Sequence, residues 1–261
     1  MKTKNLLASF ALGVGVVLSA MPSAQSAVLY SNYGNSQILN FFPGAGLEGS
    51  EFGDEVMLDI SGGAPAALLS RFQFNAVAKG YTGNPTINAQ VRFYANDGPP
   101  LGTTPRPGTQ IWDSLVFPIT LGIMPPGWVP GDPLGPIPNV GTVTEYNFDF
   151  NSADIASLLQ GVIVPKDFTW TVQFSNLEGG TAGLPIFGPP NIGNGYTDYW
   201  LKTDPTWSLF GGAPGDNTDY SFAGAFEGTP VPEPGSIAMA CVVCLGGLVA
   251  WRKRSKANVA S

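Results

Sequence analysis

Four acidic residues stand out as groups that could do chemistry, because an isolated carboxyl can act as an acid, a base or a nucleophile. They are Asp97, Asp113, Glu145 and Asp149. Glycoside hydrolases use two such groups that face each other across the scissile bond. The sequence does not pair them, and Glu145 and Asp149 fall on the polar face of an expected strand, where charge serves solubility. A secreted glycoside hydrolase is therefore kept as an alternative, and the chain is expected not to be an enzyme.

A second group of oxygen-bearing side chains lies nearer the C-terminus. Asp216, Asn217 and Asp219 carry oxygens of the kind that calcium accepts, but they lack the spacing of an EF-hand loop. Asp and Asn also stabilise polar turns through local hydrogen bonds. We expect a turn here, with these three residues as the calcium candidates and no cofactor.

Aromatic side chains could bind carbohydrate, because exposed rings stack on sugars, although most buried aromatic residues are core. The candidates are Tyr81, Trp112, Trp128, Tyr199, Trp200 and Trp207. Trp128 lies among prolines with no strand to explain it, so it is the candidate glycan contact, with inward packing as the equal alternative. A carbohydrate-binding β-sandwich, with extracellular polysaccharide as partner, is the second alternative.

Composition excludes several classes of function. The chain has no histidine, which removes the usual general base and every triad built on imidazole. Cys241 and Cys244 both lie in the apolar C-terminal stretch, so the remainder has no thiol or disulfide. Between Val28 and Pro232, eighteen acidic and six basic residues give a net charge of -12, which repels phosphate backbones. Nucleic acid is excluded as a partner.

Hydrophobic alternation predicts the strands that must position these groups. Along Ile87–Ala95 and Asp167–Phe174 apolar residues alternate with polar ones, which predicts one buried and one wet face. Eight or nine strands are expected in all. The other candidate strands are Glu55–Ile60, Ser70–Val77, Ile111–Phe117, Val143–Phe150, Trp207–Phe210 and Tyr220–Phe226.

The strands recur without the helical spacers that a parallel sheet needs, so the predicted fold is all-β: an antiparallel β-sandwich, with a jelly roll as one form of it. One connecting helix is expected at Ser152–Gln160. Gly98–Gly108 and Ile123–Val140 are rich in proline and glycine and are expected to be surface loops. A flat threonine array, as ice binding would require, is not found.

The N-terminus has the three-part layout of a secretory signal peptide, predicted to span residues 1–27. Lys2 and Lys4 precede an apolar run, and small residues follow it, so cleavage is expected after Ser26 or Ala27. An uncleaved anchor is the alternative. In both cases the domain at 28–230 is exported.

The C-terminus is predicted to cross the membrane once. The apolar run Ile237–Trp251 is shorter than the roughly twenty residues of a typical spanning helix, but flanking residues extend it to 236–251. A basic tip at 252–256, with Arg252, Lys253 and Arg254, follows at once and places the C-terminus in the cytoplasm. Cys241 and Cys244 are then membrane lining, with lipidation of one of them as an alternative.

The order of these parts resembles the sorting tail of PEP-CTERM proteins, whose tail is also catalogued as an ice-binding protein C-terminal domain. The motif is Val231, Pro232, Glu233, Pro234 and Gly235, followed by the apolar run and the basic tip, so that residues 231–261 form the tail. The resemblance implies a Gram-negative bacterium and processing at the motif by an exosortase. Glu233 would then be recognised by that enzyme.

Export and this tail together indicate a destination. We expect a chain that is briefly anchored in the inner membrane and then released to the cell surface or the extracellular matrix. Its partners would be the secretion machinery and an exosortase. A non-enzymatic structural or interaction role is the first hypothesis for the exported part.

Overall fold

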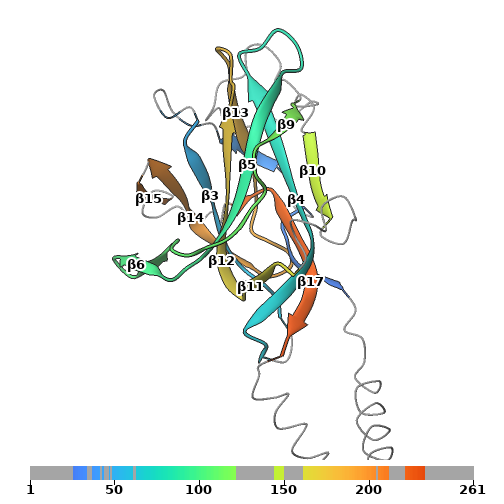
Figure 1. Ribbon diagram of the computed structural model, residues 1–261, viewed down its shortest axis with the longest axis vertical. Helices are drawn as coiled ribbons and strands as arrows, with labels where there is room; N and C mark the ends of the chain where they lie inside the picture. The colour runs from blue at the N-terminus through green and yellow to red at the C-terminus, as the bar shows by residue number, and fades with distance from the viewer. Residues whose placement is uncertain are drawn as a thin grey trace, which may run out of the picture. The chain divides into compact units, whose positions relative to one another are not determined.

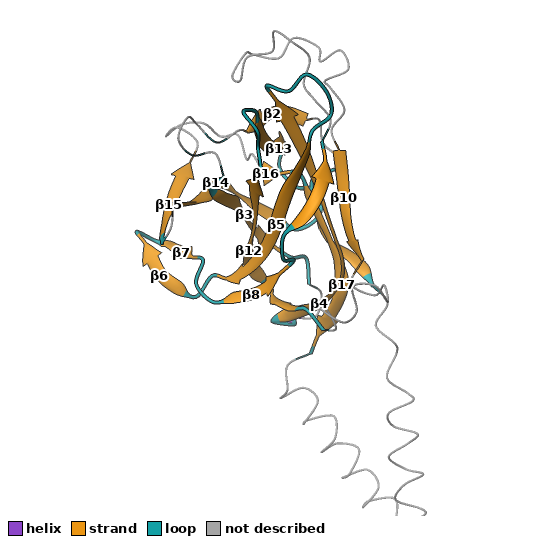
Figure 2. Ribbon diagram, turned by 45° about the horizontal axis from the view of Figure 1, so that its top comes forward, coloured by secondary structure: helices purple, strands orange, loops and turns teal. Residues whose placement is uncertain are grey.

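The computed structural model describes most of the exported part, and its strands are shown in Figure 1. The described residues contain strands and no α-helix (Figure 2). They are residues 26–33, 37–41, 43, 47, 49–60, 63–121, 144–149, 161–203, 205–211 and 221–232.

The first of two large sheets has eight antiparallel strands, ordered β1-β17-β4-β13-β16, with β10 and β11 also pairing with β4, and β2 with β13. The longest strand is β4, which pairs with β17, β13, β10 and β11. The bounds are β1 Ala27–Ser31, β2 Gln37–Phe41, β4 Ala66–Lys79, β10 Thr144–Asp149, β11 Ile163–Pro165, β13 Thr181–Phe187, β16 Ser221–Phe222 and β17 Gly224–Val231.

The second sheet has seven strands, ordered β15-β14-β3-β12-β5-β8, with β9 also pairing with β5. A separate hairpin pairs β6 with β7. The bounds are β3 Glu51–Met57, β5 Thr86–Ala95, β6 Gly98–Leu101, β7 Thr104–Arg106, β8 Gln110–Asp113, β9 Phe117–Thr120, β12 Asp167–Ser175, β14 Asn194–Thr203 and β15 Thr206–Gly211. All pairings described are antiparallel, so the predicted all-β, sandwich-like class is confirmed.

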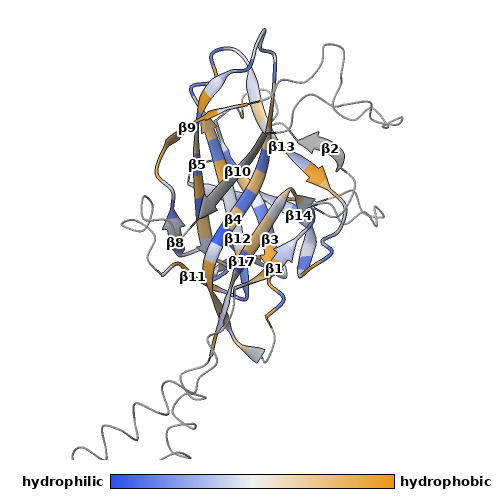
Figure 3. Ribbon diagram, turned by 90° about the vertical axis from the view of Figure 1, so that its right-hand side faces the viewer, coloured by the Kyte–Doolittle hydropathy of each residue, from blue (hydrophilic) through white to orange (hydrophobic). Residues whose placement is uncertain are grey.

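The core lies between the two sheets and is rich in aromatic rings. Phe72 of β4 stands 5.3 Å from Phe93 of β5 and 5.1 Å from Trp170 of β12, measured between ring centroids. Phe226 of β17 lies 5.1 Å from Phe168 of β12. Such edge-on and offset contacts stabilise beyond the area they bury. Hydropathy alternates along the strands that supply these rings (Figure 3).

The two strands with the clearest alternation are confirmed almost to the residue, as β5 and β12. The predicted Ser70–Val77 lies within β4 and Trp207–Phe210 within β15, and Val143–Phe150 contains β10. The predicted Glu55–Ile60 is displaced, because β3 begins at Glu51 and ends at Met57.

Three expectations were wrong. The expected loop Gly98–Gly108 contains the β6–β7 hairpin. The expected single strand Ile111–Phe117 is divided into β8 and β9 by a turn at Leu115, whose φ of 58° is outside the strand range. The expected Tyr220–Phe226 is interrupted at Ala223, and β17 continues to Val231. Seventeen strands are described, where eight or nine were expected, because short strands carry little periodic signal.

Gly53 allows β3 and β12 to approach each other closely. It pairs with Thr171, and a Cβ at Gly53 would overlap the carbonyl oxygen of Trp170 and lie 2.5 Å from the Cα of Thr171. Since the obstacle is backbone, the strands would have to separate. We expect Gly53→Ala to cost at least about 1–3 kcal/mol in the free energy of unfolding, measured by urea titration. Gly83→Ala, with no atom within 4 Å of the new Cβ, is the control; equal losses would contradict the close approach.

The described strands belong to one compact unit, Ser26–Pro230, and a second unit comprises Met1–Gln25 and Val231–Ser261. Of the second unit only Val231 and Pro232 are described. The expected helix at Ser152–Gln160, the loop at Ile123–Val140, the signal peptide before Ser26 and the apolar run at Ile237–Trp251 lie outside the described residues. Within the described part, no helix is long and apolar enough to span a bilayer.

Candidate functional site: the outer face of the seven-stranded sheet

The densest set of polar side chains lies on the face of the seven-stranded sheet that points away from the core. Strand register builds it in rows. Lys202, Glu51, Gln173 and Gln90 form one row across β14, β3, β12 and β5. The next rows run through Thr171, Arg92 and Asp113, and through Glu55, Thr169 and Tyr94. We call this set the outer face.

Arg92 is the centre of the ionic part of the outer face. Its Nη1 donates to Glu51 Oε2 at 2.8 Å and its Nε to Asp113 Oδ2 at 3.0 Å. The Glu51 side chain is 5% exposed and takes further hydrogen bonds from Thr171 and Lys202. Burial alone would lower the pKa of Arg92, but Glu51 and Asp113 raise it overall. Both charges of the Arg92–Glu51 pair are therefore held in place.

Asp113 is stabilised as an anion. Burial alone would raise the pKa of its carboxyl, but hydrogen bonds from Gln90, the Leu115 amide and Arg92 lower it overall. Gln90 Nε2 lies 2.8 and 2.9 Å from the two carboxylate oxygens. The same carboxylate accepts from Leu115 N, which fixes the turn between β8 and β9.

Aromatic side chains cover part of the outer face. Tyr94, Trp200 and Trp207 form a second, smaller hydrophobic cluster, with exposures of 4%, 0% and 8%. The ammonium of Lys202 lies 5.4 Å from the centroid of Tyr94 and 5.2 Å from that of Trp207, within cation–π range. Three of the six candidate sugar-stacking residues, Trp112, Trp200 and Trp207, are buried, so they are core residues and cannot stack on a sugar.

A second polar cluster lies beside the first and contains acids without basic partners. Asn96 Nδ2 donates to Glu55 Oε1 at 2.9 Å and to Asp167 Oδ1 at 2.7 Å. Tyr196 donates its hydroxyl proton to Asp167 Oδ2 at 2.7 Å, and Thr169 donates to Asn96 Oδ1 at 2.7 Å. Desolvation, followed by the charge of Asp167, raises the pKa of Glu55 to about 8.

The expectation of a wet polar face was wrong for β12 and holds only in part for β5. Thr169 and Thr171 are fully buried, and Tyr94 is nearly so. The alternation correctly separated the two faces of both strands, but both faces of β12 are covered, whereas Asn88, Gln90 and Arg92 of β5 stay partly exposed. The outer face is thus packed and internally hydrogen-bonded, which is typical of a structural network rather than of an open catalytic cleft.

The predicted carboxylates take structural roles where they are described. Asp97 accepts from the amide and the hydroxyl of Thr109, and these bonds lower the pKa of its carboxyl. Asp113 belongs to the Arg92 network. Glu145 and Asp149 lie on β10, opposite Asn75 and Arg71, but their side chains are outside the described part. Among the described residues, no group of three acidic, histidine or cysteine side chains is arranged to hold a metal.

Several candidate residues fall outside the described residues. These are Trp128, the calcium candidates Asp216, Asn217 and Asp219, the motif residues Glu233, Pro234 and Gly235, and the basic tip Arg252, Lys253 and Arg254. Of the motif, Val231 is the last residue of β17 and Pro232 follows it. Six residues of the two polar clusters could not be recognised from the sequence, since their partners lie on other strands. They are Glu51, Glu55, Arg92, Asn96, Asp167 and Tyr196.

An acid is also buried between the sheets. Asp54 is 1% exposed and accepts from the amide of Phe222 at 2.9 Å. Burial raises the pKa of its carboxyl well above the ordinary value. Tyr30 and Ser221 lie nearby, and Asn32 ties β1 to the Ser221–Gly224 segment through three hydrogen bonds. This cluster joins strands inside the core and does not face solvent.

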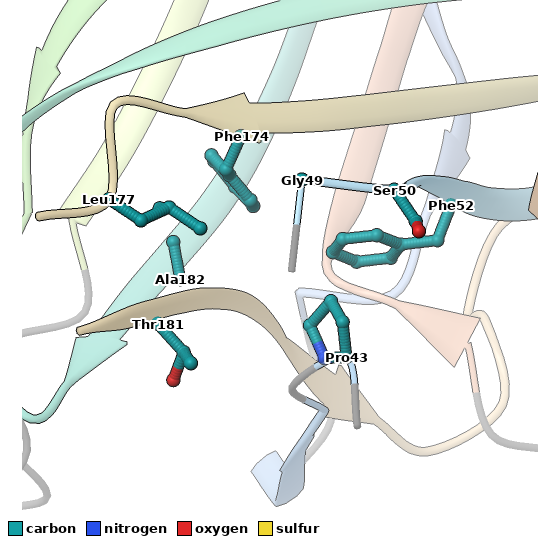
Figure 4. Close-up of a pocket in the computed structure, with 8 residues that line it drawn as sticks. All are labelled: Pro43, Gly49, Ser50, Phe52, Phe174, Leu177, Thr181 and Ala182. Carbon is teal, nitrogen blue, oxygen red and sulfur yellow. The ribbon is translucent and has the colours of Figure 1, made fainter. Parts of the chain in front are cut away.

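The recess described between the sheets is apolar and small (Figure 4). It holds about 200 Å³ of space between atoms, open solvent included, but leaves no room for a water molecule, so it is far smaller than a ligand pocket. Its walls are Pro43, Gly49, Ser50, Phe52, Phe174, Leu177, Thr181 and Ala182. We interpret it as a packing defect.

Comparison with known proteins gives no match to any family model, curated protein or solved structure.

Proposed function

We propose that the chain is an exported, non-enzymatic β-sandwich module, and that an exosortase processes its C-terminal tail on the way to the cell surface or the extracellular matrix. A signal peptide directs export, and one C-terminal helix with a cytoplasmic basic tip holds the chain in the inner membrane until processing. The exported domain then serves a structural or interaction role outside the membrane.

The observation that carries the proposal is the agreement between the folded unit and the two processing sites. The unit spans Ser26–Pro230, and its terminal strands are β1, from Ala27, and β17, to Val231. The expected signal cleavage falls at Ser26 or Ala27, and the motif begins at Val231. Cuts at these sites remove at most Ala27 from the start of β1 and leave the rest of the strand pairing intact, because they fall where strand pairing begins and ends.

Pairing between the first and last strands adds support. Ala27 lies opposite Gly228 and Val28 opposite Glu227, so the start of β1 and the end of β17 lie at the same end of this antiparallel pair. We expect the motif to be extended, since prolines at 232 and 234 block both helix and ladder hydrogen bonds. An extended segment just outside a sheet is accessible to a protease.

A structural role is supported by the outer face, where polar groups bind one another. Arg92, Glu51 and Asp113 are each held by several partners, and the aromatic rings beside them are buried. The chain also passes repeatedly from one sheet to the other between β2 and β16, for example along β2–β3–β4–β5 and β11–β12–β13–β14, a connectivity that favours a jelly-roll-like sandwich.

Processing can be tested with a matched pair of variants expressed in a bacterium that encodes an exosortase. Glu233→Gln changes the motif, and Glu227→Gln makes the same change on β17, where Glu227 forms a half-exposed ion pair with Arg71 at 3.2 Å. We expect the Glu233 variant to stay in the membrane fraction with its tail, and the Glu227 variant to be processed like the natural chain. Equal processing of both variants would contradict recognition of Glu233.

A further inference from the structure

Glu55 is an acid that the outer face buries without an opposite charge. It is 1% exposed, and its Oε2 has no hydrogen-bond partner among the described residues. The ion pairs of the described part join Arg71, Arg92 and Lys202 to other acids and leave Glu55 out. An isolated charge at such a position is costly, so the group must be neutralised.

The groups that face Glu55 come from three neighbouring strands. On β12, Asp167 adds negative charge, which raises the pKa of Glu55; on β14, Asp198 adds more negative charge and the indole N–H of Trp200 favours the carboxylate. Tyr196 of β14 points its hydroxyl at Asp167, and Asn96, directly after β5, bridges Glu55 and Asp167. Asp54 lies beside it on β3, on the core side of the sheet. None of these groups is a cation.

We propose that Glu55 is protonated in the folded chain and that this neutral carboxyl, bridged to Asp167 by the amide of Asn96, fastens β3 to β12 and β5 until the proton is lost. A proton fits this site better than a metal ion, since the acidic side chains of the described part do not converge as a metal site would require. Each carboxyl gives one oxygen to Asn96, so the second oxygen of Glu55 is free to hold the proton.

The direction of the pH effect follows from where the proton binds. Unfolded Glu has a pKa near 4.5, and folding raises the pKa of Glu55 to about 8. Below 4.5 both states hold the proton and folding carries no penalty. Between 4.5 and 8 the folded chain keeps a proton that the unfolded chain has released, so stability falls as the pH rises, and above 8 the loss is complete.

The direct test is a carboxyl-carbon NMR titration of the full chain with labelled glutamate, in which Glu55→Gln identifies the resonance. We expect the Glu55 signal to titrate near pH 8, far from the ordinary 4.5. The assigned resonance belongs to Glu55 alone, so the titration of Asp54, whose pKa burial also raises, does not affect the result. A Glu55 signal that titrates near 4.5 would overturn the proposal.

Hydrogen exchange tests the release of the strands. Between pH 4.5 and 8, the opening constant for amides of β12 should rise by up to about tenfold per pH unit, after correction for base catalysis, and it should level off above 8. Glu55→Gln keeps the shape and the acceptor for Asn96 but has no proton to lose, so its β12 amides should show no such rise. Glu178→Gln, an exposed surface control, should behave like the natural chain. Loss of protection in both variants alike, or protection restored by calcium instead of acid, would overturn the proposal.

Discussion

Replacing Arg92 with methionine should cost about 3–5 kcal/mol in the free energy of unfolding, because it strands a buried charge. The substitution keeps an unbranched stem but removes the guanidinium donors that bind Glu51 at 2.8 Å and Asp113 at 3.0 Å. Glu51, 5% exposed, would keep only Lys202 as a cationic partner, at 3.4 Å. Urea unfolding at neutral pH measures the loss.

The control is Arg71→Met, which removes the other arginine ion pair described. Arg71 and Glu227 are 40% and 34% exposed, so we expect a loss of at most about 1 kcal/mol. Adding Glu51→Gln to Arg92→Met should recover part of the stability, since the orphaned charge is then gone. Similar losses for Arg92→Met and Arg71→Met would show that the outer face does not bury its charges.

Trp170→Ala, made alone, should lower the free energy of unfolding by about 3–5 kcal/mol, because it opens a cavity at the centre of the core. Trp170 is fully buried on β12 and contacts Phe72 at 5.1 Å and Phe74 at 6.2 Å between centroids. Its ring links the seven-stranded sheet to β4 of the eight-stranded sheet. Thermal and urea unfolding should both report the loss.

Trp170→Phe separates ring packing from hydrogen bonding. The indole Nε1 is buried without a partner among the described residues, so phenylalanine removes no hydrogen bond there. We expect a cost below about 1.5 kcal/mol, as for other conservative core exchanges. If phenylalanine proved as damaging as alanine, the ring contacts with Phe72 and Phe74 could not be the main contribution of Trp170.

The strands that the sequence predicts best are those with one apolar and one polar face. β5 and β12 alternate throughout, so period alone locates them. β13 is buried on both faces over most of its length and contains Gly183 and Pro185, which are typical of turns, so its pattern does not indicate a strand. β14 begins at Asn194–Gly195, a turn signal as well.

The candidate site was less predictable, since it depends on register between strands far apart in the sequence. Asn96 and Asp167 are separated by 71 residues, and Arg92 and Glu51 by 41. Each residue alone suggests only a solvated polar face. These residues are buried because β3, β12 and β5 are neighbours and because Trp200 of β14 and Trp207 of β15 pack beside them. Alternation within one strand carries no information about such neighbours.

Processing at both ends is tested by the intact mass of the mature protein, purified from a bacterium that encodes an exosortase. The mass reports both ends of the chain at once. We expect an N-terminus at Ala27 or Val28 and a chain without Arg252, Lys253 and Arg254. A mature protein that still carries this basic tip would contradict the proposed processing.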